Sequence, residues 1–564
     1  MKKSRLYLVI ISMSLFFFDT SLFAQDFEWV KQIGGSSNDY SAKIAVDALG
    51  NVYTTGYFQG TVDFDPSPAS YPLTSEGLYD VFISKTDASG NFVWAKQLGG
   101  TDFDNGYSIA IDGIGNVYAT GVFRLTADFD PGAGTFNMTS QGNDDVYVLK
   151  LDASGNFIWA RQIGGNGLDI GASIITDVSG NIYVSGLFEG TVDFDPGAGT
   201  QNLVSAGGRD AFVLKLDASG DFVWAKHIGG IGTDYARSLD IDGSGNVYAA
   251  GYFENIVDFD PGAGIHNLES FGGRDAFILK LDASGNFVWA KTYGGLAGDE
   301  VMALAVDDSG ISYITGFFNG TVDFDPGNGT YDLTSAGGED IYILKLDALG
   351  NFIWAKQIGD TGNESGRSIA IDGSGNSYIS GYFRETADFN PGVGSHNLTS
   401  AGGSDIFILK LDALGNFIWA KQIGGAGDDG GQSITIDASG NIFTTGYFNG
   451  TVDFDTGIST FNLSSVGEMD IFIHKLSQNA VGINENLVRL FNIYPNPAKD
   501  VITISELPIG AELSILDING KIMFSTSVNS NQLTINTEDF TNGLYLIHLN
   551  HSGATSTKKL IVNK

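Results

Sequence analysis

The chain has 564 residues, no cysteine and a formal net charge of −36. The lack of cysteine excludes disulfides, thiol nucleophiles, cysteine-ligated zinc and a lipid anchor at a cysteine. Residues 25–486 carry the negative charge, with 59 acidic and 21 basic side chains, and such a surface repels nucleic acid and anionic lipid. We therefore expect no nucleic-acid partner. The charge is either a solvated acidic coat or a surface for divalent cations or basic partners.

Residues 1–24 have the layout of a secretory signal peptide. Three basic residues within the first five precede a mostly apolar run over residues 6–18, and Ala24 is a small residue at the expected cleavage site. The apolar run is too short to span a bilayer, which takes about 20 residues. No later stretch approaches that length, so we expect export to the periplasm and no transmembrane segment.

The dominant feature of the chain is a repeat of fixed length. Neighbouring tryptophans are always 65 residues apart, at positions 29, 94, 159, 224, 289, 354 and 419. A constant period without insertions indicates a repeat architecture. Motifs found in one unit will therefore recur in the others, whereas a catalytic site is normally a single asymmetric cluster.

One unit contains four short β-runs, at Ser238–Ile241, Val247–Phe253, Ala276–Leu281 and Phe287–Lys291. The first pair is joined by Asp-Gly-Ser-Gly-Asn and the second by Asp-Ala-Ser-Gly-Asn, which are typical of tight hairpins. The runs are apolar on both faces, as expected for a sheet that is covered on both sides. The unit is therefore a small antiparallel sheet packed between copies of itself.

The ends of the array distinguish a closed ring from an open solenoid. The first unit begins with an unpaired Trp strand at residues 27–30, and the last unit loses its Trp strand, since Asn484 stands where Trp is due. The first strand can therefore complete the last sheet, whereas an open stack would need two polar caps. We predict an all-β fold, a seven-bladed β-propeller of 65-residue units over residues 25–480, closed by the N-terminal Trp strand.

The repeated pattern GNVYATGxF…DxFxLKLDASGNFxWAKQIGG resembles the bacterial β-propeller repeats of the SBBP type. The resemblance extends over roughly residues 27–480. It implies the propeller fold and no particular reaction.

Residues 487–564 differ from the repeats, and residues 481–486 form the expected linker. The tail has no tryptophan and no net charge, and its strand-like alternation predicts a small immunoglobulin-like β-sandwich. The YPNP sequence at 494–497, the turn at 517–521, the GLY sequence at 543–545 and the terminal lysines resemble the C-terminal sorting domain of the type IX secretion system of Bacteroidota. The resemblance implies that the type IX machinery is a partner, followed by release or attachment to surface glycolipid. The alternative is an ordinary immunoglobulin-like binding module.

Six acidic residues recur in each unit, and most are expected to stabilise turns. Asp177 and Asp217 precede hairpin turns, and Asp210 precedes the third strand of its unit. Aspartates at such positions accept hydrogen bonds from nearby backbone amides. We interpret these three as structural residues.

Asp193 and Asp195 form a pair that permits a second interpretation. Carboxylates and carbonyls that converge on a loop are what Ca²⁺ requires. The pair is similar to the Asp-rich calcium loops of integrin-type propellers, although Pro196 and Gly197 stand where further acids would be expected and Asn390 replaces one Asp. An acidic turn and a calcium loop both stay open, and calcium is the one cofactor considered. The candidate calcium ligands are Asp63, Asp65, Asp128, Asp130, Asp193, Asp195, Asp258, Asp260, Asp323, Asp325, Asp453 and Asp455.

The tryptophans also have two interpretations. A flat indole suits the apolar face of a sugar, so seven Trp strands would offer stacking platforms. A tryptophan at the same point of every sheet is more often a packing residue between blades.

The sequence does not predict an enzyme. The six histidines share no recognised motif, and no Gly-x-Ser-x-Gly elbow, His-x-x-x-His pair or phosphate loop is present. An acid pair that recurs in every unit indicates a scaffold rather than a tuned acid and base. Deviations between units are scattered along the chain. Some come in symmetry-related pairs, such as Arg124 with Arg384 and Arg237 with Arg367.

Together these features predict a non-catalytic propeller that is secreted or attached to the outer surface. It is expected to be a binding, adhesion or structural platform for an extracellular glycan or protein, since loops on a rigid scaffold form good binding surfaces. The alternatives are a hydrolase or lyase that acts on extracellular polysaccharide, and calcium-stabilised adhesion. Propellers host many functions, so the fold does not choose among these.

Overall fold

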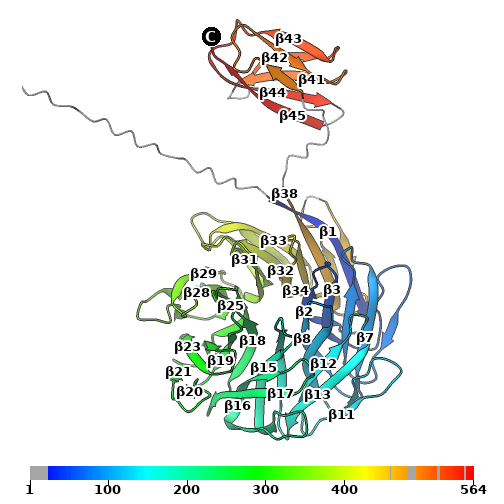
Figure 1. The fold of residues 1–564 in the computed structure, drawn as a ribbon, viewed down its shortest axis with the longest axis vertical. Helices are drawn as coiled ribbons and strands as arrows, with labels where there is room; N and C mark the ends of the chain where they lie inside the picture. The colour runs from blue at the N-terminus through cyan, green and yellow to red at the C-terminus, as the bar shows by residue number, and fades with distance from the viewer. Residues whose placement is uncertain (1–22, 458, 481–490, 518–520, 552–553) are drawn as a thin grey trace, which may run out of the picture. The chain divides into compact units, whose positions relative to one another are not determined.

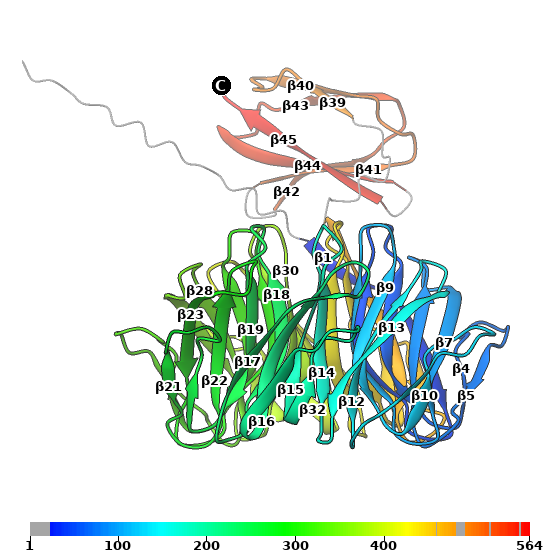
Figure 2. The same cartoon turned by 60° about the horizontal axis from the view of Figure 1, so that its bottom comes forward.

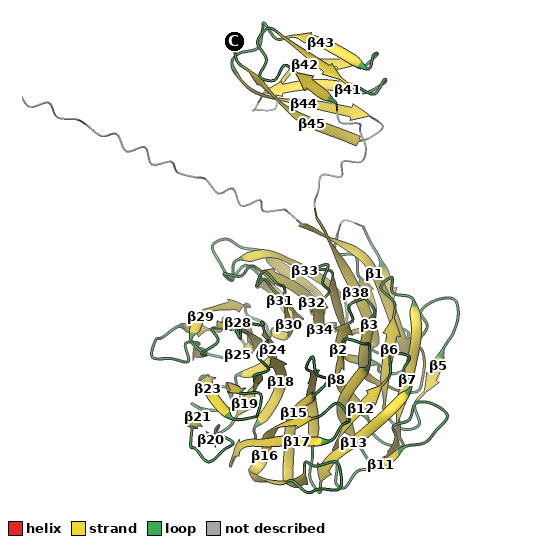
Figure 3. Ribbon diagram, in the orientation of Figure 1, coloured by secondary structure: helices red, strands yellow, loops and turns green. Residues whose placement is uncertain are grey.

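The computed structural model describes residues 23–457, 459–480, 491–517, 521–551 and 554–564. Within these ranges every helix or strand is a β-strand (Figure 1, Figure 3), which confirms the all-β prediction. The chain divides into two compact units, Gln25–Gln478 and a second unit that contains Asn479–Lys564. Nearly all of the predicted signal peptide, and the linker at 481–486, lie outside the described residues. In the described ranges, no helix is long and apolar enough to cross a membrane.

The first unit consists of four-stranded antiparallel sheets, the blades, arranged around one axis (Figure 1). Each blade runs outward in chain order, as in β18-β19-β22-β23. The described strands contain seven such sets of four. Figure 2 shows the blades standing side by side around the ring. We call them blades 1 to 7, in the order of their innermost strands.

The innermost strands are β2 (Tyr40–Val46), β8 (Asn105–Ile111), β14 (Ile170–Thr176), β18 (Tyr235–Ile241), β24 (Glu300–Val306), β30 (Ser365–Ile371) and β34 (Gly430–Ile436). The second strands are β3 (Val52–Phe58), β9 (Val117–Phe123), β15 (Ile182–Asp193), β19 (Val247–Phe253), β25 (Ser312–Phe318), β31 (Ser377–Asp388) and β35 (Ile442–Phe448). The third strands are β6 (Asp80–Thr86), β12 (Asp145–Leu151), β16 (Asn202–Leu216), β22 (Asp275–Leu281), β28 (Asp340–Leu346), β32 (Asn397–Leu411) and β38 (Asp470–Ala480). The outermost strands are β7 (Phe92–Gly100), β13 (Phe157–Gly165), β17 (Phe222–Gly230), β23 (Phe287–Tyr293), β29 (Phe352–Ile358), β33 (Phe417–Gly425) and β1 (Phe23–Gly35).

The ring is closed by the first strand of the propeller. The innermost strands contact one another in cyclic order, and β34 of blade 7 lies against β2 of blade 1. In blade 7 the order is β34-β35-β38-β1, so the N-terminal Trp strand is the outermost strand of the last sheet. The predicted propeller, closed by this strand, is therefore confirmed.

The long segment between the second and third strands forms an edge hairpin on the preceding blade. Gly229 and Gly230 at the end of β17 pair with Asp258 and Val257 of β20. Such a hairpin ties its own blade to the one before it, whereas the hairpin of Thr321–Asp323 and Asp332–Thr334 forms a separate two-stranded sheet. Where they are separate strands, these hairpins are β4 (Thr61–Asp63) with β5 (Pro72–Thr74), β10 (Thr126–Asp128) with β11 (Asn137–Thr139), β20 (Ile256–Asp258) with β21 (Asn267–Glu269), β26 (Thr321–Asp323) with β27 (Asp332–Thr334) and β36 (Thr451–Asp453) with β37 (Asn462–Ser464).

The hydrophobic core lies between neighbouring blades. One cluster joins Tyr183 and Val213 of blade 3 to Ala249 and Phe277 of blade 4, and all four side chains are buried. This explains why the strands are apolar on both faces, since each blade is covered by two others.

The second unit has a separate core. It contains β39 (Asn492–Tyr494), β40 (Val501–Ser505), β41 (Glu512–Asp517), β42 (Ile522–Ser527), β43 (Gln532–Asn536), β44 (Gly543–His551) and β45 (Ala554–Val562). These strands form one sheet in the order β39-β40-β43 and another in the order β42-β41-β44-β45. Ile502 from the first sheet and Ile515 and Ile547 from the second belong to one buried cluster. The tail is therefore a two-sheet sandwich.

Candidate functional site

Each innermost strand contains a β-bulge near its start. In β18, Ala236 pairs with Gly251 and Ser238 with Ala250, so Arg237 has no partner in the register. A bulge interrupts the alternation of the strand and re-aims a side chain, which is why the strand begins at Tyr235 rather than at the predicted Ser238. The bulge residues differ from blade to blade and are Ala42, Tyr107, Ala172, Arg237, Met302, Arg367 and Gln432.

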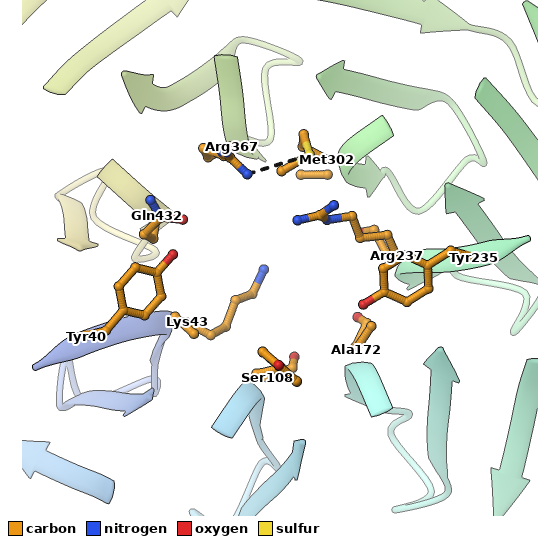
Figure 4. Close-up of a pocket in the computed structure, with 14 residues that line it drawn as sticks. Tyr40, Lys43, Ser108, Ala172, Tyr235, Arg237, Met302, Arg367 and Gln432 are labelled. Atoms are coloured by element: carbon orange, nitrogen blue, oxygen red, sulfur yellow. Dashed lines mark hydrogen bonds between the residues drawn. The ribbon is translucent and has the colours of Figure 1, made fainter. Parts of the chain in front are cut away.

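All seven bulge residues line one cavity of about 310 Å³ at the centre of the ring (Figure 4). Every innermost strand contributes to its wall. The differences between units look scattered in the sequence because they recur at multiples of 65 residues. The closed ring brings them to one place, which corrects the interpretation of them as scattered.

Three basic side chains from three blades point into this cavity: Lys43 of blade 1, Arg237 of blade 4 and Arg367 of blade 6 (Figure 4). No Asp or Glu is among the described residues that line it. The rest of the lining is formed by Tyr, Ser, Ala, Met and Gln. The cavity is thus cationic, although the propeller as a whole is strongly acidic.

Arg367 makes its direct contacts with neutral groups, and Glu339 interacts with it electrostatically. Its Nη1 lies 3.9 Å from the Met302 sulfur, and its Nη2 donates to the Tyr382 hydroxyl at 3.3 Å. The guanidinium also lies over the Tyr382 ring, at 5.1 Å from the centroid. Its buried Nε has no hydrogen-bond partner.

Arg237 shares a single carboxylate with a second arginine. Its Nη1 lies 3.5 Å from Oε2 of Glu300, whereas Arg274 donates to Oε1 of the same residue at 2.9 Å. Arg274 has a second partner in Glu254, whose Oε1 lies 3.2 Å from its Nε, whereas Glu300 is the ion-pair partner of Arg237. Figure 4 shows the Arg237 guanidinium directed toward the centre of the cavity.

Lys43 extends into the cavity near the partly buried Asp240. Burial lowers the pKa of Lys43, and the negative charge of Asp240 opposes this change. Burial also raises the pKa of Asp240, to about 6. Both oxygens of Asp240 already accept backbone hydrogen bonds, from Ile241 at 2.8 Å and Val306 at 2.7 Å.

In the acid pair of an edge hairpin, Oδ1 of each acid accepts hydrogen bonds within the loop. Asp193 Oδ1 accepts hydrogen bonds from the backbone of Asp195 at 3.1 Å and Gln201 at 2.7 Å, and Asp195 Oδ1 accepts one from Gly197 at 2.8 Å. Among the described residues, no group of three or more His, Cys, Asp or Glu side chains could hold a metal ion. The geometry supports the acidic turn, and the calcium loop stays a prediction. The first acid of the pair makes the same bonds at Asp63, Asp128, Asp258, Asp323 and Asp453.

The other recurring acids stabilise turns and blade edges. Asp177 Oδ1 accepts backbone hydrogen bonds from Ser179 and Asn181, both at 2.9 Å. Asp210 Oδ2 accepts one from Ala206 at 2.7 Å. Asp169 is fully buried, and burial raises its pKa to about 7. The hydrogen bonds of Asp177 and Asp210 are those expected from the sequence, and Asp169 accepts one from the Gly165 backbone at 2.7 Å.

The tryptophans and the recurrent lysines join neighbouring blades. Trp94 Nε1 lies 3.4 Å from the Ala153 carbonyl oxygen of the next blade, and only 8% of Trp94 is exposed. Lys150 Nζ donates to the Ala218 carbonyl oxygen at 3.1 Å and lies 5.0 Å from the centroid of the Tyr118 ring. The position of Trp94 supports packing between blades rather than sugar stacking.

Parts of this chain match two protein families. Residues 492–563 match the family described as a secretion system C-terminal sorting domain. Residues 28–57, 93–122, 158–187, 353–382 and 418–452 match the family described as a beta-propeller repeat. The chain therefore contains β-propeller repeats and a type IX sorting domain. The sorting domain implies interaction with the type IX machinery, export, and an outer-surface or secreted location.

Two curated proteins resemble this repeat protein over most of its length. An uncharacterized WD repeat-containing protein, L264, of Acanthamoeba polyphaga mimivirus is 25% identical over 504 residues, which cover 75% of this chain and 36% of the relative. The regulatory protein FlaEY of Caulobacter vibrioides is 24% identical over 428 residues, which cover 70% of this chain and 43% of the relative. The chain therefore spans less than half the length of these relatives.

Among solved structures, PorZ of Porphyromonas gingivalis, an essential surface component of the type IX secretion system, aligns with 95% of this chain and 100% of its own. Its sequence identity is 11% and its TM-score is 0.16. A TM-score this low does not argue for a common fold or function.

Proposed function

We propose that this exported propeller is a non-catalytic binding protein, whose ligand is an extracellular glycan or protein that enters the central cavity. One observation carries the proposal: the framework residues recur in every blade, whereas the bulge residues differ and together line the cavity. A specific binding site requires side chains that differ from one blade to another and that meet at one place on the repeated scaffold.

The absence of turnover is also part of the proposal. Asp240, the acid beside Lys43, has both oxygens engaged by backbone amides, and Glu300 is engaged by two arginines. Neither carboxylate is placed as a free general base. The single feature that favours the alternative, a polysaccharide hydrolase or lyase, is the proximity of Lys43 and Asp240, both with shifted pKa values.

The test is a binding screen with the purified full chain against glycans and surface proteins, followed by analysis of each bound glycan for cleavage. Ala172→Tyr partly fills the cavity with the side chain type that blade 2 already carries at its bulge, Tyr107. We expect this variant to lose binding by tenfold or more, while Val178→Tyr, at a fully exposed hairpin position, binds normally. Equal binding by both variants would place the ligand elsewhere, and release of cleaved product would favour the enzyme.

A further inference from the structure

The cavity concentrates positive charge in a domain that is otherwise acidic. Its lining holds three basic and no acidic side chains, although acids outnumber bases by 59 to 21 over residues 25–486. A recess of one sign within low-dielectric walls focuses the electrostatic field and attracts ligands of the opposite sign. This cationic recess lies at the centre of the ring.

The acidic partners of these arginines do not line the cavity. Arg367 directly contacts a thioether, a hydroxyl and an aromatic ring, and Glu339 interacts with it electrostatically. Arg237 pairs with Glu300, which also binds Arg274, and Arg274 has a second partner in Glu254. A negative group that entered the cavity would therefore meet basic side chains and no acidic lining residue, and could accept charge-assisted hydrogen bonds from them.

Lys43 replaces a residue with a structural role. At the equivalent position the hydroxyls of Ser108, Ser173 and Ser238 accept backbone hydrogen bonds from the innermost strand of the following blade, at 3.2, 3.3 and 3.1 Å. Lysine has no acceptor, so blade 1 forgoes this link to blade 2. Instead, the ammonium group of Lys43 is directed into the cavity (Figure 4).

From this geometry we infer that the cavity binds an anionic group of its ligand, a carboxylate, sulfate or phosphate, between Lys43, Arg237 and Arg367. The inference rests on the proposed function and adds the chemical class of the ligand. Guanidinium groups bind planar and tetrahedral oxyanions through paired hydrogen bonds. A volume of about 310 Å³ is at the lower end for small-molecule sites. It therefore suits one acidic sugar residue or a free oxyanion.

Other blades supply the variants that test this inference. Lys43→Ser, Arg237→Ala and Arg367→Met each introduce the residue that another blade carries at the same position, namely Ser108, Ala172 and Met302. The control is Arg209→Ser, which removes one positive charge from a half-exposed ion pair with Glu189 outside the cavity.

The experiment is calorimetric titration of the full chain with four probes: inorganic sulfate, inorganic phosphate, a uronate oligosaccharide and its neutral counterpart. We expect the uronate to bind and the neutral sugar not to bind. Each cavity variant should bind the uronate about ten- to a hundredfold more weakly, because each loses a charge-assisted hydrogen bond, and the control should be unchanged. Binding of inorganic sulfate or phosphate with the same loss in the variants would equally support an anion site, with a free oxyanion as the ligand.

Two results would overturn the inference. If the neutral sugar binds as well as the uronate, and the cavity variants bind both normally, the anion site is wrong while the proposed binding function stands. If none of the four probes binds at millimolar concentration, the anion site is again wrong. The proposed function then depends on the separate screen with glycans and proteins.

Discussion

Glu28 and Lys475 are 447 residues apart in the chain, and their side chains form an ion pair with 2.9 Å between Oε1 and Nζ. The pair joins β1 to β38 in blade 7. Gln32 of β1 adds hydrogen bonds from Nε2 to the Ser464 carbonyl oxygen and to Asp470 Oδ2, both at 2.7 Å. The contacts that close the ring are thus made between the two ends of the repeat array.

Removal of the closing strand should destabilise the whole propeller. A protein that begins at Gly34 lacks most of β1, so blade 7 loses its outermost strand and the buried Trp29 and Ile33 side chains. Compared with a protein that begins at Gln25, we expect its melting temperature to fall by many degrees. Trp29→Ala alone should cost about 3–5 kcal/mol of unfolding free energy.

Glu28→Gln is the matched control for these changes. Glu28 is about two-fifths exposed, and exposed ion pairs contribute about 1 kcal/mol or less. We expect a shift of a degree or two in the same thermal melt. An unchanged melting temperature after loss of residues 25–33 would mean that the ring does not depend on β1.

The buried aspartates at the start of the innermost strands should make the propeller more stable in mild acid. Burial raises the pKa of Asp104 to about 7, from the ordinary value of 3.8. The folded state therefore binds a proton at this carboxyl more tightly than the unfolded state does. Protonation stabilises the fold as the pH falls from about 7 toward 4, and this stability is lost as the pH rises again. Burial raises the pKa to about 7 in the same way at Asp39, Asp169, Asp234 and Asp299.

We therefore expect a higher melting temperature at about pH 5 than at about pH 8, measured by calorimetry in buffers of equal ionic strength. Asp104→Asn should reduce this difference, whereas Asp308→Asn, at an exposed position, should not. The turn aspartates act in the opposite sense at lower pH. Burial opposes ionisation of Asp177, but hydrogen bonds that Asn181 donates help to lower its pKa below the ordinary value. The stability that these bonds contribute is therefore lost as the pH falls below about 4. A melting temperature that falls steadily from pH 8 to pH 5 would contradict the prediction.

Calcium should have little effect on stability. Oδ1 of Asp193 and Oδ1 of Asp195 already accept backbone hydrogen bonds, and a ligand that binds the folded state must raise the melting temperature. We expect the same thermal melt in calcium and in chelator, with Asp193→Asn as a variant that keeps a loop acceptor. An increase of several degrees in calcium, lost in this variant, would establish the calcium loop.

The sorting domain should be needed for export and dispensable for the propeller. Its buried cluster contains residues of 491–562 alone, so deletion of residues 491–564 leaves the propeller core intact. We expect the truncated protein to remain inside the outer membrane, detected by protease protection of whole cells, and to show the same propeller melting temperature. Fusion of residues 491–564 to an exported reporter should bring that reporter to the surface. Normal surface display of the truncated protein would contradict the assignment.

Much of the fold could be predicted because its causes are local and repeated. The hairpin sequence from Asp217 to Asp221, copied with small changes in each unit, specifies tight turns. The unpaired strand around Trp29 reveals ring closure because an unpaired sheet edge requires a partner. The role of Lys150 was harder to predict, because its partners are the Ala218 carbonyl oxygen of the next blade and a tyrosine ring. These contacts depend on the angle between blades, which no local pattern encodes.

The sequence by itself determined the blade, the period and the strand that closes the ring, since hydrophobic alternation, turn residues and spacing act over short distances along the chain. Only the tertiary structure decided what the differences between units mean. Lys43, Arg237 and Arg367 are separated by 130 residues or more and become neighbours because each lies at or beside the bulge of an innermost strand. Closure of the ring converts positions that are equivalent in the repeat into one wall around the axis, and so turns scattered substitutions into a cationic cavity.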